Sequence, residues 1–139
     1  MTERALSFIV IDDSELDCFV IKKIIQHNYI KSSVQTFQSA ELALQRIQIT
    51  DSVDTRPTII LLDLQMPLMN GYQFIEAFEN LPEEVRNNYV IIILSILPSM
   101  KTIRDISGEF KKETVNSIIE KPLTIEKLVL LLGRIGLSI

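Results

Sequence analysis

Cysteine is nearly absent from this chain of 139 residues, in which Cys18 is the only one. It cannot form an internal disulfide, and its place in a helical pattern suits a small buried side chain better than a reactive thiol. Long apolar runs are missing too. The run beginning at Leu6 and the run at 90–97 are too short for a signal peptide or a membrane span. We therefore expect a cytoplasmic protein that does not enter a membrane.

A strong excess of charge is absent as well. The formal net charge of -4 is mild, which argues against non-specific binding of nucleic acid. The chain has no internal repeat, no low-complexity segment and no linker to a second domain. With 47% hydrophobic residues it is long enough to enclose one core. We expect a single domain over residues 1–139, without an output domain in this chain.

The strongest pattern is a set of short apolar runs that stop at polar residues. Continuous apolar runs bounded in this way are typical of strands buried on both faces. The runs and the residues that end them are Phe8–Ile11 with Asp12 and Asp13, Thr58–Leu62 with Asp63, and Tyr89–Leu94 with Ser95. A fourth expected strand, Val115–Glu120, ends at Lys121. A fifth run, Val34–Phe37, alternates and is short, as an edge strand would be.

Helical patterns lie between and after these runs, so strand and helix alternate five times. The expected helices span 15–26, 40–50, 72–81, 98–110 and 125–135, of which 98–110 is only weakly periodic. This alternation implies a parallel sheet covered by helices on both faces.

The first and last helices carry apolar residues at helical spacing, and those of the last helix indicate which side faces the core. In the first helix the residues at helical spacing include Leu16, Phe19, Val20 and Ile24. In the last helix the expected core face is Ile125, Leu128, Val129 and Leu132, with Leu130 and Leu131 largely off it. The last two either widen the core stripe or form an apolar surface for a partner or a second copy.

The polar residues that end the strands should meet, because the carboxyl ends of parallel strands lie on one edge of a sheet. Three carboxylates, a hydroxyl and an ammonium would then surround one shallow pocket. Clustered carboxylates repel one another unless a cation neutralises them, and oxygen ligands in an open site favour Mg²⁺. A carboxylate in such surroundings can attack a phosphoryl group, with catalysis by positioning and electrostatics.

Over essentially its full length the chain resembles the receiver domain of two-component response regulators. The residues that carry the resemblance are Asp12 and Asp13 after the first strand, Asp63 with Pro67 and Gly71 after the third, Ser95 after the fourth, and Lys121 with Pro122 after the fifth. The resemblance implies an α/β, flavodoxin-like, doubly wound fold with a five-stranded parallel sheet in the order 2-1-3-4-5. In this family the Lys–Pro bond is commonly cis.

The resemblance also implies a role for each site residue. Asp63 would accept the phosphoryl group, and Ser95 and Lys121 would hold its oxygens. Asp13, Asp63 and the backbone carbonyl of Gln65 would bind Mg²⁺, with Asp12 acting mostly through water. The implied phosphodonor is a histidine kinase or a histidine phosphotransfer protein. The implied output is a downstream protein or a homodimer, contacted through the last helix and strand; no nucleic acid is expected.

Three features depart from the family pattern. Ile96 follows Ser95 where a small residue is usual, and it could narrow access to the pocket. Ile118 stands three residues before Lys121, where family members often have a switching aromatic residue. The segment between Ser95 and Lys121 is longer than usual. The family pattern therefore does not establish whether a fourth helix forms there.

Other function classes fit less well. An aspartate-nucleophile phosphohydrolase would have a second aspartate two residues after Asp63, where this chain has Gln65. A flavodoxin would need a phosphate-binding loop after the first strand, but Asp12 and Asp13 would repel a phosphate. The alternative is a degenerate receiver that binds partners without phosphorylation, and Ile96 is the residue that favours it. We do not expect an enzyme, beyond self-phosphorylation and dephosphorylation.

Overall fold

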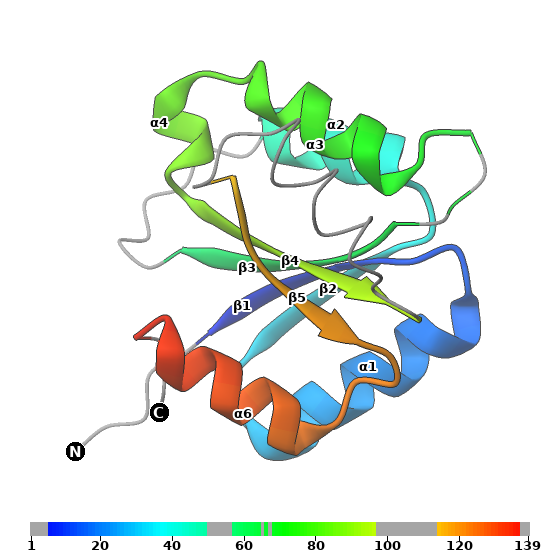
Figure 1. The fold of residues 1–139 in the computed structure, drawn as a ribbon, viewed down its shortest axis with the longest axis vertical. Coiled ribbons are helices and arrows are strands. Elements are labelled where there is room, and N and C mark those ends of the chain that lie inside the picture. Colours follow the sequence, from blue (N-terminus) through cyan, green and yellow to red (C-terminus); the bar gives the residue numbers. More distant parts are fainter. Residues whose placement is uncertain (1–5, 50–56, 65, 67, 97–113, 137–139) are drawn as a thin grey trace.

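The computed structural model describes residues 6–49, 57–64, 66, 68–96 and 114–136. Within them one parallel sheet has the strand order β2-β1-β3-β4-β5 (Figure 1). Its strands are β1 (Ser7–Ile11), β2 (Ser33–Phe37), β3 (Thr58–Asp63), β4 (Tyr89–Ser95) and β5 (Val115–Glu120). The predicted fold class and strand order are confirmed, and β2 is an edge strand as expected.

Helices cover both faces of the sheet. They are α1 (Glu15–Asn28), α2 (Ala40–Ile49), α3 (Gly71–Glu79), α4 (Glu83–Arg86) and α6 (Ile125–Arg134). In Figure 1, α1 and α6 lie on one face, and α2, α3 and α4 lie on the other. The helix expected at 98–110 lies outside the described residues. Among the described helices, none has both the length and the apolar sequence that a membrane crossing requires.

The central strands are buried on both faces, which explains their continuous apolar sequences. In β3, Ile59 and Leu61 pack with residues of α1 and α6, whereas Ile60 and Leu62 pack with residues of α2 and α3. All four side chains are fully buried. The sheet therefore separates two hydrophobic layers, and its strand ends are held rigidly between them.

In the first helix, Cys18 is buried as predicted, but three of the apolar residues at helical spacing are exposed. Leu16, Phe19 and Val20 are 69%, 58% and 44% exposed. The core face of α1 is formed instead by Cys18, Ile21 and Ile25. A helix on one face of a sheet buries a single stripe, and residues three or four apart share that stripe. Leu16, Phe19 and Val20 lie off this stripe and are therefore exposed.

The core face of α6 was also predicted incorrectly at two positions. Leu131 is buried, whereas Val129 is half exposed. The buried stripe is centred on Leu128, and Leu131 and Leu132, three and four residues further on, lie on the same side. Leu130 is exposed as expected.

Candidate functional site

Four strands of the sheet end around one acidic pocket. The parallel register places Asp63 beside Leu94, the last residue before Ser95, and Ser95 beside Glu120, the last residue before Lys121. The pocket has a volume of about 470 Å³, and its lining is Asp12, Asp13, Ser14, Asp17, Asp63, Leu64, Tyr72, Ser95, Ile96 and Lys121. The side chains that the sequence predicted to meet therefore do so. Gln65 lies outside the described residues.

Three carboxylates form the acidic part of the pocket. One oxygen from each of Asp12, Asp13 and Asp63 lies within 4.8 Å of the others. Asp12 and Asp63 are buried, whereas Asp13 is exposed. Oxygen donors this close together fit a hard divalent cation such as Mg²⁺, which keeps several water ligands and needs only one or two carboxylates.

Asp12 is fixed by hydrogen bonds at both of its carboxylate oxygens. The backbone N–H of Ser14 donates to Oδ1 at 2.9 Å, and Lys121 Nζ donates to Oδ2 at 2.8 Å. Ser14 is also the N-cap of α1, so the same short turn ends β1, orients Asp12 and starts the helix. The Cys18 thiol donates to the Asp12 carbonyl oxygen at 3.3 Å, which ties α1 to this turn.

Lys121 lies among carboxylates. Its Nζ is 2.8 Å from Asp12 Oδ2, 3.3 Å from Asp17 Oδ2 and 3.8 Å from Asp63 Oδ1. Burial by itself would lower the pKa of Lys121. The hydrogen bond and charge of Asp12, followed by the charge of Asp63 and the hydrogen bond of Asp17, outweigh burial and raise this pKa above the ordinary lysine value. Lys121 is therefore a fixed ammonium at neutral pH.

Ser95 and Lys121 are joined through the backbone. The N–H of Lys121 donates to the carbonyl oxygen of Ser95 at 2.7 Å, directly after the last paired residues of β4 and β5. The Lys121–Pro122 peptide bond is cis, as the family resemblance implied. Ser95 and Lys121 both line the acidic pocket, and they stand at the ends of the adjacent strands β4 and β5.

Gly71 holds the start of α3 against the residue after β3. Its N–H donates to the carbonyl oxygen of Leu64 at 3.0 Å. A Cβ at this position would lie 2.7 Å from Leu64 Cα and 2.8 Å from the Asp63 carbonyl oxygen. Both are backbone atoms, so the approach is possible only for glycine. Asn70 and Gln73 then complete a capping box that begins α3.

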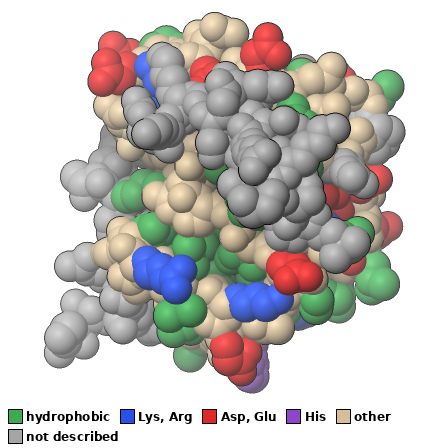
Figure 2. Space-filling view, viewed as in Figure 1, with side chains coloured by type: hydrophobic (Ala, Val, Ile, Leu, Met, Phe, Trp, Pro, Cys, Tyr) green, Lys and Arg blue, Asp and Glu red, His purple; other side chains and the backbone are tan. Residues whose placement is uncertain are grey.

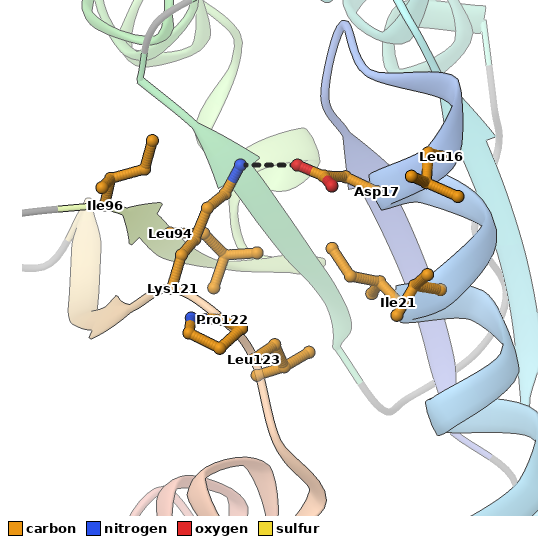
Figure 3. A pocket seen from close by; sticks show the side chains of 9 residues that line it. Leu16, Asp17, Ile21, Leu94, Ile96, Lys121, Pro122 and Leu123 are labelled. Carbon is orange, nitrogen blue, oxygen red and sulfur yellow. Dashed lines mark hydrogen bonds and ion pairs between the residues drawn. The ribbon is translucent and has the colours of Figure 1, made fainter.

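A second pocket of about 370 Å³ adjoins the first and is mainly apolar (Figure 3). Asp17, Ile96 and Lys121 line both pockets. The remaining lining of the second pocket is Leu16, Val20, Ile21, Leu94, Pro122 and Leu123. Ile96 is 67% exposed, so it stands at the rim between the two pockets.

The fold and this arrangement agree with one protein family. A family model described as the response regulator receiver domain matches residues 8–132. The chain belongs to this family. A receiver domain is a module of two-component signalling, and the acidic pocket of this receiver matches the expected position at the carboxyl ends of the strands.

Solved receiver structures and curated relatives agree with the assignment. A response regulator receiver protein from Dyadobacter fermentans is 34% identical, with a TM-score of 0.81, over 96% of this chain and 99% of that chain. A two-component response regulator from Cytophaga hutchinsonii has a TM-score of 0.80 at 23% identity, over 96% and 98% of the two chains, and supports the fold. Two-component response regulator 24 of Arabidopsis thaliana is 28% identical over 98% of this chain and 88% of its own length.

One similar protein is much longer. The protein-glutamate methylesterase/protein-glutamine glutaminase of Treponema pallidum is 34% identical over 90 residues, which are 65% of this chain and 20% of that protein. The receiver therefore corresponds to only a small part of that relative.

Two further positions bear on the comparison with the family and on the site. Ile118, where the family often has an aromatic residue, is half-buried and packs against the layer that contains α2 and α3. Asp17 was not predicted as a site residue, yet it contacts Lys121. Its signal in the sequence is weak: it stands four residues after Asp13, one turn into a helix capped by Ser14.

Proposed function

We propose that this receiver accepts a phosphoryl group on Asp63 in a Mg²⁺-dependent reaction and signals by a change in partner binding. The observation that carries the proposal is the group of Asp12, Asp13 and Asp63 with Lys121 beside it. The carboxylate of Asp63 is the nucleophile. It lies at the end of a buried strand, where the two core layers hold it in place.

The other site residues have distinct proposed roles. Asp13 and Asp63 would hold Mg²⁺ with the backbone carbonyl of Gln65, and Asp12 would contribute mostly through water. When bound, Mg²⁺ would neutralise the carboxylates and the charge of the phosphoryl oxygens. Lys121 contributes a fixed positive charge and hydrogen bonds to those oxygens, and Ser95 contributes a hydroxyl. Catalysis then consists of positioning and charge stabilisation, and the receiver acts as a phosphoacceptor rather than as an enzyme with its own substrate.

The proposed phosphodonor is a histidine kinase or a histidine phosphotransfer protein in the cytoplasm. The apolar pocket beside Lys121 supports contact with a protein donor, because Leu16, Val20 and Ile96 leave large apolar surfaces exposed at its rim. A donor helix that covered them would bring a phosphohistidine close to Asp63 and exclude water.

The proposed output surface lies on the last strand and helix. Figure 2 shows hydrophobic side chains with Lys or Arg side chains among them over the part of this face where Figure 1 has β5 and α6. A groove of about 410 Å³ runs between these elements, lined by Ser117, Ile118, Ile119, Glu120, Lys127, Leu130, Leu131 and Arg134. A mixed apolar and basic surface of this kind suits a downstream protein or a second copy of the chain.

A second candidate function is a binding module that acts without phosphorylation. Ile96 favours it, because a large side chain stands at the rim of the pocket. In that case neither Mg²⁺ nor a phosphodonor would alter the protein.

Intact mass spectrometry distinguishes the two functions. The protein would be incubated with acetyl phosphate with and without Mg²⁺, beside an Asp63→Asn variant. The proposed function predicts one added phosphoryl group that requires both Mg²⁺ and Asp63. A protein that gains no phosphoryl group and binds no Mg²⁺ in calorimetry would instead be a binding module.

A further inference from the structure

Asp17 brings a fourth carboxylate to the acidic pocket. Its Oδ2 accepts a hydrogen bond from Lys121 Nζ at 3.3 Å, the contact drawn as a dashed line in Figure 3. The turn that precedes α1 fixes this position. Ser14 Oγ accepts a hydrogen bond from the Asp17 N–H at 3.1 Å. This bond holds Asp17 in the first turn of the helix, beside the pocket.

The three acidic neighbours of Lys121 differ in how easily they can release it. Asp12 is closest, at 2.8 Å, and its side chain is only 2% exposed, so separation would leave a buried charge without its partner. Asp17 is further away, and its side chain is 46% exposed, so water can replace the lost hydrogen bond. Asp63 Oδ1 lies at 3.8 Å, beyond hydrogen-bond distance.

We propose that Asp17 is a positioning residue that holds the Lys121 ammonium on the α1 side of the pocket until Asp63 is phosphorylated. The proposal rests on the proposed function, because it requires a phosphoryl group to draw Lys121 away. In the resting protein Asp12 and Asp17 both accept hydrogen bonds from Lys121 Nζ, whereas Asp63 Oδ1 lies 3.8 Å away, so Nζ must move toward Asp63 to donate to a phosphoryl oxygen there. On phosphorylation, Lys121 keeps Asp12 and exchanges Asp17 for a phosphoryl oxygen.

Transfer of the phosphoryl group from acetyl phosphate to Asp63 requires no proton transfer. A carboxylate oxygen of Asp63 forms a bond to phosphorus, and the bond from phosphorus to the acetyl oxygen of acetyl phosphate breaks. Acetate leaves with the electron pair, and Lys121 stays protonated throughout. Asp17 is thus paired with Lys121 before the step and with water after it, so it stabilises the resting state alone.

The first test is the rate at which Asp17→Asn accepts the phosphoryl group from acetyl phosphate with Mg²⁺. This change keeps the size of the side chain and removes its charge. We expect acceptance to be faster by about two- to fivefold, the range set by a partly exposed ion pair. The lifetime of the phosphoryl group after donor removal should be unchanged, since Lys121 has already left Asp17 in the phosphorylated state.

Glu15→Gln is the matched control. Glu15 is exposed, lies in the same first helical turn and carries the same charge. Residues two apart on a helix point to nearly opposite sides, so Glu15 faces away from Lys121. Glu15→Gln should leave the acceptance rate at the wild-type value, which separates the contact with Lys121 from the loss of one negative charge.

A second readout follows Lys121 itself. The ¹³Cε resonance of Lys121 should differ between wild type and Asp17→Asn in the resting proteins, and the difference should disappear once both are phosphorylated. Glu15→Gln should give the wild-type resonance in both states. A purely structural role for Asp17 predicts no such convergence.

The outcomes separate this proposal from the proposed function. If the wild type takes up no phosphoryl group, the proposed function and this proposal both fail. If the wild type is phosphorylated but Asp17→Asn accepts at the same rate or more slowly, only the role of Asp17 is overturned. A resonance difference that persists after phosphorylation overturns it as well, because Lys121 would then still contact Asp17.

Discussion

Helices α1 and α3 both begin with a side-chain cap beside the acidic pocket, yet they use their apolar residues differently. In α3 the large residues Phe74, Ile75 and Phe78 are all buried. In α1 two large residues, Leu16 and Phe19, are more than half exposed. The apolar residues of α3 therefore serve the core, whereas Leu16 and Phe19 of α1 leave most of their surface exposed, with Phe19 in contact with the surface residue Lys23. They are available for a protein that approaches the pocket.

The largest expected effect of this difference is on stability. Phe74→Ala should lower the free energy of unfolding by about 3–5 kcal/mol, because Phe74 is fully buried and stacks on Phe78. Phe19→Ala should cost less than about 1 kcal/mol, since this side chain is exposed and its contact with Lys23 is a surface cation–π pair. Urea unfolding followed by circular dichroism would measure both, because the chain has no tryptophan.

Equal losses of stability in the two variants would contradict the distinction between the helices. Phe19 would then contribute to the fold as much as a core residue, and its exposure could not indicate a partner surface.

The second effect concerns how α3 is attached to the site. Gly71→Ala should destabilise the protein by about 1–3 kcal/mol and slow phosphoryl acceptance, because the new Cβ would push against backbone atoms of Asp63 and Leu64. Gly133→Ala in α6 is the matched control. Nothing lies within 4 Å of its Cβ position, so it should stabilise the protein by about 0.5–1 kcal/mol. A Gly71→Ala protein with wild-type stability and activity would refute the close approach.

The third effect tests the outer face of α1. A Leu16→Ser, Val20→Ser variant should accept the phosphoryl group from a phosphorylated histidine phosphotransfer domain more slowly by about fivefold or more, since apolar contacts would be lost. Its rate with acetyl phosphate should be unchanged. Leu42→Ser, an exposed change on α2, serves as the control. Equal slowing by Leu42→Ser, or slowing with both donors, would argue against docking at α1.

The smallest effect concerns the inner face of α1. Burial, followed by the negative charges of Asp12 and Asp17, raises the pKa of the Cys18 thiol to about 11. The folded protein should therefore react very slowly with iodoacetamide at neutral pH and rapidly in urea. Rapid labelling of the folded protein would contradict the burial of Cys18.

The raised pKa of the Cys18 thiol also makes stability depend on pH. Its contribution to the free energy of unfolding is fully present below the ordinary thiol pKa of 9.0 and is lost as pH rises through about 11.

The strands and the site were predictable from the sequence because each buried strand is apolar until a polar residue ends it. Asp63 and Ser95 stand at such ends, and the parallel register then leaves little freedom in where they meet. Helix faces were less predictable. On α1 apolar residues occupy both the inner and the outer face, so spacing alone did not identify the side that Cys18 shares with the core.

The role of Asp17 was also not predictable from the sequence. Its contact with Lys121 joins residues 104 positions apart in the chain and depends on how α1 leaves its capping turn. An aspartate in the first turn of a helix is common because it favours the positive end of the helix dipole, and that ordinary role hides the specific one.

The central claim is that the phosphoryl group is attached to Asp63. Borohydride reduces an aspartyl phosphate to homoserine, so treatment after incubation with Mg²⁺ and acetyl phosphate, followed by peptide mass spectrometry, identifies the modified position. We expect homoserine at position 63 in the wild type and no homoserine in the Asp63→Asn variant. Homoserine at position 12 or 13, or a phosphoryl adduct that survives in Asp63→Asn, would contradict the account.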